Sequence, residues 1–196
     1  RAALRSRPAR PDGDQSLVKT LTLLRHAKSG WDDPVARDFD RPLNARGRRA
    51  AATMGRQMRS LGLEFDHVLA SPAVRVTETI AEVESGYGRT LAPEWDKRAY
   101  LASAGTLLDL VRETDDAHAR LLIVGHNPGL EELVLDLAVD QAGDLRDAVE
   151  EKYPTATLAE MTFDVASWKD VARGGATLTR FVRPRDLDAT LGPDDD

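Results

Sequence analysis

Three short apolar runs in this sequence are each followed, within two residues, by a histidine or a serine. The runs cover Leu21–Leu24, Val68–Ala70 and Leu121–Val124. Apolar runs of this length that are bounded by Gly or Pro are typical of buried strands in a parallel sheet. Ligands of open α/β sheets bind beyond the carboxyl ends of the strands. The sequence therefore predicts that the polar groups after the three runs meet at one edge of a sheet.

Helical patterns lie between these runs, and capping residues mark where the helices begin. Asn44 is suited to cap a helix over Ala45–Leu61, where apolar residues recur at helical spacing. Ser71 is suited to cap a second helix, with Pro72 in its first turn and an end near Glu84. We therefore expect a helix after each of the first two strands.

The rest of the sequence continues the alternation of strands and helices. The further expected elements are a weak strand at 90–92, a helix that begins at Ser103 or Thr106, a helix after Gly129, and strands at 157–164 and 176–182. Such an alternation predicts a single-domain three-layer α/β/α sandwich with a mostly parallel sheet.

The 196 residues fit one domain with short extensions. We expect the folded domain to cover residues 20–185. Residues 1–19 contain four arginines and no apolar signal core, which favours a disordered basic arm over a targeting peptide. Residues 186–196 are expected to form an acidic, solvated tail.

Charge and composition exclude several classes of function. The net charge of −6 argues against general binding to nucleic acid. No apolar stretch approaches the ~18 residues of a membrane span, so we expect no membrane partner. The sequence has no cysteine, which excludes disulfides, thiolate catalysis and Cys-ligated zinc and fits a cytoplasmic protein.

His26 directly follows the first apolar run and Arg25. A neutral imidazole has one nitrogen with a free lone pair, while its other N–H can donate to a backbone carbonyl. His26 is therefore suited to attack phosphorus and form a phosphohistidine intermediate that water hydrolyses. The alternative is a histidine with satisfied hydrogen bonds at a strand end, beside a surface arginine.

Two further side chains fit the same chemistry. Arg75 lies in the first turn of the helix expected after Ser71, where a planar guanidinium can bind phosphate oxygens with two hydrogen bonds. His126 follows the most apolar run and can donate to a phosphoryl oxygen as charge builds in the transition state. The alternatives are a solvated helix arginine and a structural histidine in a turn.

Metal catalysis is the rival interpretation, because acidic residues crowd the segment after His26. They are Asp32, Asp33, Asp38 and Asp40. However, no HExxH, HxH, calcium-loop or Walker pattern occurs in the sequence. We therefore interpret these acids as solvating the loop, and we expect neither a metal nor a cofactor.

Four segments together resemble the histidine phosphatase superfamily, whose fold is phosphoglycerate mutase-like. They are similar above all to its SixA-type phosphohistidine phosphatases, over about residues 20–165. The segments are Leu23–Ser29 with Trp31, Asp40–Asn44, Ser71–Thr79 and Val124–Gly129. Each is weak alone, but all four occur in the order that the family has. A Lys-Tyr-Pro-Thr segment at 152–155 is also similar to the SixA branch.

The resemblance implies roles for individual residues. It implies that His26 is the phosphorylated nucleophile and that Arg25, Arg75 and His126 bind the phosphoryl group. Arg41 resembles the additional phosphate-facing arginine of the SixA branch. Many members also carry an acidic general acid after the third strand, and Asp96 is the candidate here, although the spacing does not fix it.

Because the spacing does not fix a general acid, the kind of leaving group decides which substrate we expect. Expulsion of an alkoxide benefits from a positioned proton donor, typically by 10²–10⁴-fold, whereas the P–N bond of phosphohistidine is labile. We therefore expect a phosphohistidine in a partner protein as substrate. The alternatives are a broad phosphomonoesterase that acts on small phosphate esters and a noncatalytic phosphate-binding protein on the same fold.

Overall fold

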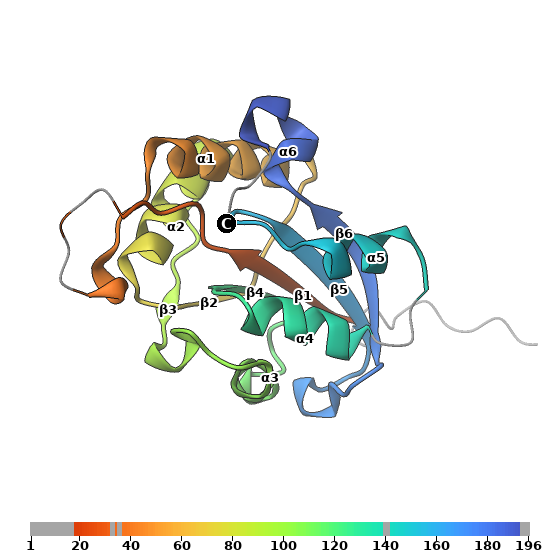
Figure 1. Cartoon of the computed structure of the whole chain (residues 1–196). Coiled ribbons are helices and arrows are strands. Elements are labelled where there is room, and N and C mark those ends of the chain that lie inside the picture. The colour runs from red at the N-terminus through yellow and green to blue at the C-terminus, as the bar shows by residue number, and fades with distance from the viewer. Residues whose placement is uncertain (1–17, 32–33, 35–36, 139–141, 193–196) are drawn as a thin grey trace, which may run out of the picture.

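A six-stranded sheet in the order β3-β2-β4-β1-β5-β6 crosses the molecule (Figure 1). The computed structural model describes residues 18–31, 34, 37–138 and 142–192. The strands are β1 (Val18–Arg25), β2 (His67–Ala70), β3 (Glu94–Trp95), β4 (Arg120–Gly125), β5 (Leu158–Asp164) and β6 (Ala176–Val182). Neighbours from β3 to β1 pair in parallel, while β5 runs antiparallel to β1 and to β6. The mostly parallel sheet is confirmed.

Helices cover both faces of the sheet, as predicted (Figure 1). One face packs against α1 (Ala45–Ser60), α2 (Val74–Tyr87) and α6 (Pro184–Leu187). The other packs against α3 (Ala104–Glu113), α4 (Gly129–Leu137) and α5 (Asp144–Glu151). Short 3₁₀ helices are η2 (Asp38–Asp40), η3 (Lys97–Ala99), η4 (Trp168–Asp170) and η5 (Ala189–Leu191).

The central strands are apolar on both sides because both faces of the sheet are covered. In β1, Leu21 and Leu23 belong to the core under α3 and α4, while Leu24 belongs to the core under α1 and α2. In β4, Ile123 and Val124 divide in the same way. A buried parallel strand therefore appears in the sequence as an unbroken apolar run rather than as an alternating one.

Several predicted boundaries need correction. Ser71 does not cap α2, which begins three residues later, because its Oγ accepts the N–H of Ala73 at 3.3 Å in a turn before the helix. The strand predicted at 90–92 is wrong. Ala92 has a φ of +48°, which interrupts an extended strand, and β3 follows at Glu94–Trp95.

The caps predicted for two other helices are present in the structure. The Asn44 side chain accepts the N–H of Gly47 at 2.8 Å and caps α1, and Ser103 rather than Thr106 caps α3. Helix α5 was not predicted. No helix among the described residues has the length and apolar character needed to cross a membrane.

The chain ends lie partly beyond the described region. Residues 1–17 of the expected basic arm and residues 193–196 of the expected acidic tail fall outside it. Residues 186–192 of that tail are folded, since Leu191 is buried and its carbonyl accepts a hydrogen bond from Arg46 at 2.7 Å. The folded part of the chain therefore extends past residue 185.

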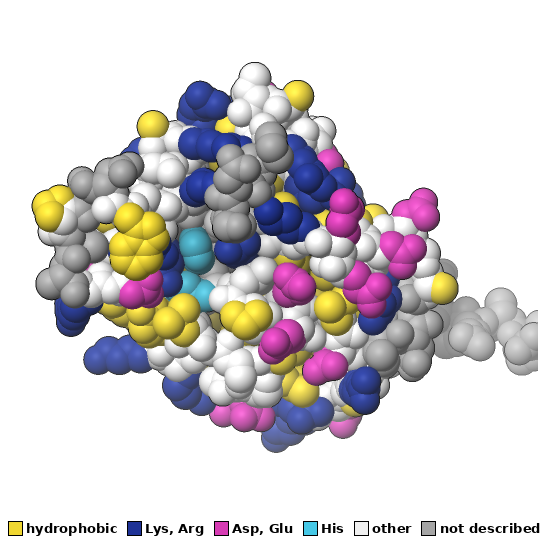
Figure 2. All heavy atoms as spheres, viewed as in Figure 1, with side chains coloured by type: hydrophobic (Ala, Val, Ile, Leu, Met, Phe, Trp, Pro, Cys, Tyr) yellow, Lys and Arg dark blue, Asp and Glu magenta, His cyan; other side chains and the backbone are white. Residues whose placement is uncertain are grey.

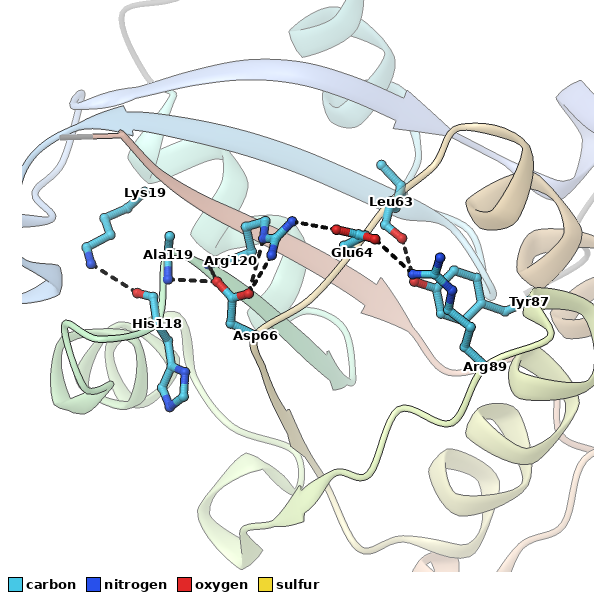
Figure 3. Close-up of polar contacts among 9 residues, drawn as sticks. All are labelled: Lys19, Leu63, Glu64, Asp66, Tyr87, Arg89, His118, Ala119 and Arg120. Atoms are coloured by element: carbon cyan, nitrogen blue, oxygen red, sulfur yellow. Dashed lines mark hydrogen bonds and ion pairs between the residues drawn. The ribbon is translucent and has the colours of Figure 1, made fainter. Parts of the chain in front are cut away.

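Polar contacts link residues at the amino ends of the central strands (Figure 3). Arg120, at the start of β4, pairs with Asp66 at 2.6 Å and with Glu64 at 3.0 Å. Glu64 also pairs with Arg89 at 3.0 Å, and Lys19 donates to the carbonyl of His118 at 3.0 Å. Arg120, Asp66, Glu64 and Arg89 therefore form a connected set of ion pairs next to the amino ends of β2 and β4.

Glycines allow α1 and α2 to approach closely. A Cβ atom on Gly86 would lie 2.1 Å from the backbone oxygen of Ala52, and one on Gly55 would lie 2.2 Å from that of Val83. Both contacts are with backbone, which cannot rotate away. The pair of glycines therefore sets the distance between the two helices that flank the site.

Gly86→Ala is expected to lower the free energy of unfolding by about 1–3 kcal/mol, as overpacking does. Gly105→Ala is the matched control, because Gly105 is also helical but a Cβ there would have 3.8 Å to its nearest neighbour. That control should be neutral or stabilising by about 0.5–1 kcal/mol. Urea unfolding measures both, and equal midpoints for the two variants would contradict the close-packing argument.

Candidate active site

The His26 side chain lies directly beyond β1 and is 7% exposed. Its Nδ1 is 2.7 Å from the carbonyl oxygen of Ala27. Because a carbonyl only accepts, we assign the ring proton to Nδ1, which leaves the lone pair on Nε2. The Nε–H of Arg75 donates to Nε2 at 3.4 Å. The ring is therefore held in the tautomer that a nucleophile requires.

Burial lowers the pKa of His26 well below its ordinary value. The hydrogen bond to Ala27 opposes this shift, while His126, Arg75 and Arg25 lower the pKa further. A histidine with a lowered pKa is neutral at physiological pH and below its usual titration range. His26 therefore keeps the Nε2 lone pair in mildly acidic conditions.

His126 lies beyond β4, which is the neighbour of β1, and its ring centroid is 5.2 Å from that of His26. Its Nε2 is 2.7 Å from Ser71 Oγ, which already accepts the N–H of Ala73. A hydroxyl can also donate, and when the Ser71 proton is donated to Nε2 the ring proton of His126 lies on Nδ1. This Nδ1 is buried and has no hydrogen-bond partner among the described residues. Burial, followed by the charge of Arg75, lowers the pKa of His126 to about 3.

Asp38 holds two of the predicted arginines in place. The Nη1 of Arg75 donates to the Asp38 carbonyl at 2.9 Å, and its Nη2 donates to Asp38 Oδ2 at 3.0 Å. Arg41 Nε lies 3.0 Å from Asp38 Oδ1, and the Tyr100 hydroxyl donates to Oδ2 at 2.7 Å. Burial alone would raise the pKa of Asp38, but Tyr100 and Arg75 lower it, so Asp38 is ionised.

Arg25, the last residue of β1, is anchored from the opposite side. Its Nη1 donates to the carbonyl of Tyr153 at 2.8 Å, and the Tyr153 hydroxyl donates to the carbonyl of Leu23 at 2.9 Å. Asn127 donates to the same Tyr153 carbonyl at 3.1 Å. The segment after α5 therefore positions side chains from the ends of both β1 and β4.

These side chains surround one cavity of about 510 Å³. Figure 2 shows histidine side chains on this face, with basic and apolar side chains beside them. The cavity is lined by Arg25, His26, Lys28, Ser29, Trp31, Asp38, Arg41, Arg75, Leu101, His126, Asn127 and Thr155. The structure thus brings together all five of the histidines and arginines that the sequence indicated.

Asp96, the candidate general acid, is not among the residues that line this cavity. Its carboxylate pairs with Arg98 at 2.8 Å, and it lines a separate cavity with His67 and His118. The hydrogen bond from Arg98 lowers the pKa of Asp96, so this carboxyl is ionised as well as displaced. We assign Asp96 no further part in the site.

Three residues that contact the histidines and arginines of the site were not predicted from the sequence. The sequence predicts that Asp38 solvates the loop, but in the structure Asp38 contacts both Arg75 and Arg41. Ser71 contacts His126 rather than capping α2, and Tyr100 donates a hydrogen bond to Asp38. No pattern in the sequence marks contacts between separate loops. Of the other loop acids, Asp32 and Asp33 lie outside the described residues.

Metal-ligating side chains do not gather in the part of the chain that the structure describes, where no group of three or more His, Cys, Asp or Glu is placed to hold an ion. The donors around the cavity are instead guanidinium and imidazole groups. Such groups bind oxyanions rather than cations.

Comparison with known proteins identifies the family. The sequence profile of the histidine phosphatase superfamily (branch 1) matches residues 21–121. An uncharacterized protein of Mycobacterium tuberculosis is 35% identical over 164 residues, which are 83% of this chain and 100% of that protein. The chain belongs to the histidine phosphatase superfamily. Membership assigns it to the phosphatases, which are hydrolases that act on phosphoryl groups.

Solved structures of histidine phosphatases have the same architecture. A protein of Nakamurella multipartitia assigned as the phosphohistidine phosphatase SixA is 27% identical, with a TM-score of 0.74 over 85% of this chain and 96% of that one. Its counterpart from Agrobacterium tumefaciens is 26% identical, with a TM-score of 0.70 over 85% and 98% of the two chains. The predicted resemblance to SixA-type members of the superfamily is thus confirmed.

Proposed function

We propose that this histidine phosphatase removes the phosphoryl group from a phosphohistidine in a partner protein, through a covalent intermediate on His26. The observation that carries this proposal is the position of His26, whose ring proton is assigned to Nδ1, in a cavity that three arginines and a second histidine also line. The similarity to the SixA-type proteins supports the same substrate class.

The proposed reaction has two displacements. First, His26 Nε2 attacks phosphorus and forms a P–N bond, while the P–N bond of the substrate breaks and its electron pair goes to the leaving imidazole, which takes up a proton from solvent. Second, a water oxygen attacks phosphorus, and the electron pair of the P–Nε2 bond returns to His26. One proton of the water stays on the released phosphate, and the other passes to solvent, which balances the proton taken up by the leaving imidazole.

The surrounding residues stabilise the charge on the transferring group. Arg25, Arg41 and Arg75 supply positive charge and planar donors that suit three phosphoryl oxygens. The Nδ1–H of His126 has no partner among the described residues, so it is available to one of these oxygens. We expect these groups to replace the charge neutralisation that a metal provides elsewhere, so that a chelator leaves the activity unchanged.

The acid–base character of the cavity favours a P–N bond over a phosphate ester. Asp38 is the single carboxyl-bearing residue among the described residues that line the cavity, and it is ionised by its contacts with Arg75 and Tyr100. An ionised carboxylate cannot donate a proton to an alkoxide. The leaving imidazole of phosphohistidine needs less assistance from such an acid, which supports phosphohistidine as the substrate.

Trapping the intermediate tests the proposal. The enzyme is mixed with a protein that carries ³²P-phosphohistidine, quenched in alkali within one turnover and separated from the substrate. We expect label on the enzyme that is stable to alkali, is lost in mild acid and maps to the peptide that contains His26. Label that survives acid, or faster turnover of a simple alkyl phosphate than of phosphohistidine, would contradict the proposal.

A further inference from the structure

Two large apolar side chains are exposed at the mouth of the active-site cavity. Among the described residues, four large apolar side chains are exposed, and two of these four, Trp31 and Leu101, line the cavity of His26. Trp31 is 72% exposed and Leu101 is 55% exposed. The face drawn in Figure 2 shows apolar side chains next to the histidines and the basic side chains. A phosphate site alone does not require such groups, since oxyanions bind to charge and N–H donors.

The indole of Trp31 is held in place from one side. The guanidinium carbon of Arg41 lies 4.0 Å from the ring centroid, and Arg41 is fixed in turn by Asp38. Ser29, two residues earlier, forms a bridge with Leu43, so the backbone that leads to Trp31 is tied to the segment before α1. One face of the ring is therefore occupied, and the large exposed fraction leaves the other face open to a ligand.

Leu101 has an unfavourable backbone conformation that its own side chain does not offset. Its φ is +48°, a region that costs a residue with a Cβ atom about 1–2 kcal/mol. The side chain is exposed, so burial does not repay this cost. The preceding residue, Tyr100, is fixed by its hydrogen bond to Asp38. Strained backbone of this kind clusters at active sites and ligand-binding segments.

We propose that Trp31 and Leu101 form an apolar clamp for the leaving group of the substrate, namely the imidazole of a phosphohistidine and the residues that flank it in a partner protein. This inference rests on the function proposed above and names its specificity-determining residues. A planar imidazole can stack on the open indole face while its phosphoryl group reaches the arginines.

The test compares two substrates that share a P–N bond. One is a peptide that contains phosphohistidine, and the other is phosphoramidate, which has no ring. Trp31→Ala is expected to lower kcat/KM for the peptide about tenfold and to leave kcat/KM for phosphoramidate within about twofold, while Trp31→Phe restores most of the loss. Trp95→Ala is the matched control, because Trp95 is 46% exposed and is not among the residues that line the cavity.

A second variant separates the clamp from a structural role. Leu101→Gly removes the side chain and also relieves the strained φ. We expect the variant to unfold at the same or a higher urea concentration than the wild type, while its kcat/KM for the peptide falls about threefold. A purely structural residue would not give better stability together with poorer turnover.

Three outcomes would overturn the clamp. Trp31→Ala could lower turnover of both substrates equally, which would show that Trp31 acts only through Arg41, or it could change neither. Equal effects of Trp31→Ala and Trp95→Ala on turnover of the peptide would also overturn the clamp, because Trp95 does not line the cavity. In contrast, a wild-type enzyme that hydrolyses phosphoramidate but not the peptide would overturn the proposed protein substrate itself, before any variant is measured.

Discussion

His26→Ala is expected to reduce the hydrolysis of phosphohistidine by about 10⁴-fold or more. The variant removes the Nε2 lone pair that is held toward the cavity by the bond from Nδ1 to Ala27. The arginines would still bind the phosphoryl group, but water would then have to attack it without a covalent intermediate. The measurement is phosphate release from a phosphohistidine peptide, compared with the wild type at equal concentration.

The matched control is His67→Ala, a histidine substitution in a separate cavity. It should retain turnover within a few-fold of the wild type. Urea unfolding of both variants separates loss of chemistry from loss of fold. A His26→Ala enzyme that keeps a tenth or more of the wild-type rate would rule out His26 as the nucleophile.

Arg75→Lys is expected to lower kcat/KM by about 10²–10³-fold, although it preserves the positive charge. The guanidinium of Arg75 directs Nε toward His26 Nε2 while both Nη atoms are bound by Asp38. A lysine ammonium is a single point of charge and cannot make these contacts in two directions. The planar, fixed orientation of the donor is thus the property under test.

The substrate pattern distinguishes this effect from that of the apolar clamp. Loss of Arg75 should reduce turnover of the phosphohistidine peptide and of phosphoramidate by the same factor, because both present the same phosphoryl group. Arg98→Lys is the control, since Arg98 is exposed and pairs with Asp96 and Glu113. If Arg75→Lys stays within tenfold of the wild type on both substrates, Arg75 does not orient the phosphoryl group.

The sequence indicated the residues of the site that stand at strand ends. His26, Arg25 and His126 follow continuous apolar runs, and the topology of a parallel sheet requires the ends of such runs to share an edge. Arg75 and Arg41 were also indicated, the first by the helix after a strand and the second by the family resemblance. Apart from Arg41, these predictions needed only local patterns and one general rule of α/β folds.

Asp38 and Asp96 show where sequence reasoning failed. Both are acids in irregular segments, and nothing local distinguishes them. Asp38 belongs to the site because the short helix η2 faces α2, whereas Asp96 is turned away by its pairing with Arg98. Such contacts depend on how loops fold against one another. The strand at 90–92 failed for a related reason, because the left-handed φ of Ala92 is not encoded in propensity.

The spacing of the two imidazoles is set by backbone rather than by loops. Arg25 and Gly125 are partners in the parallel ladder between β1 and β4, and the N–H of His26 donates to the carbonyl of Gly125 at 3.0 Å. Neighbouring strands lie about 4.8 Å apart in any sheet. The hydrogen-bonded strands therefore fix the spacing of His26 and His126, while Trp31 and Leu101 lie on connecting segments. Changes in these segments can therefore alter which substrates bind while the two imidazoles keep their spacing.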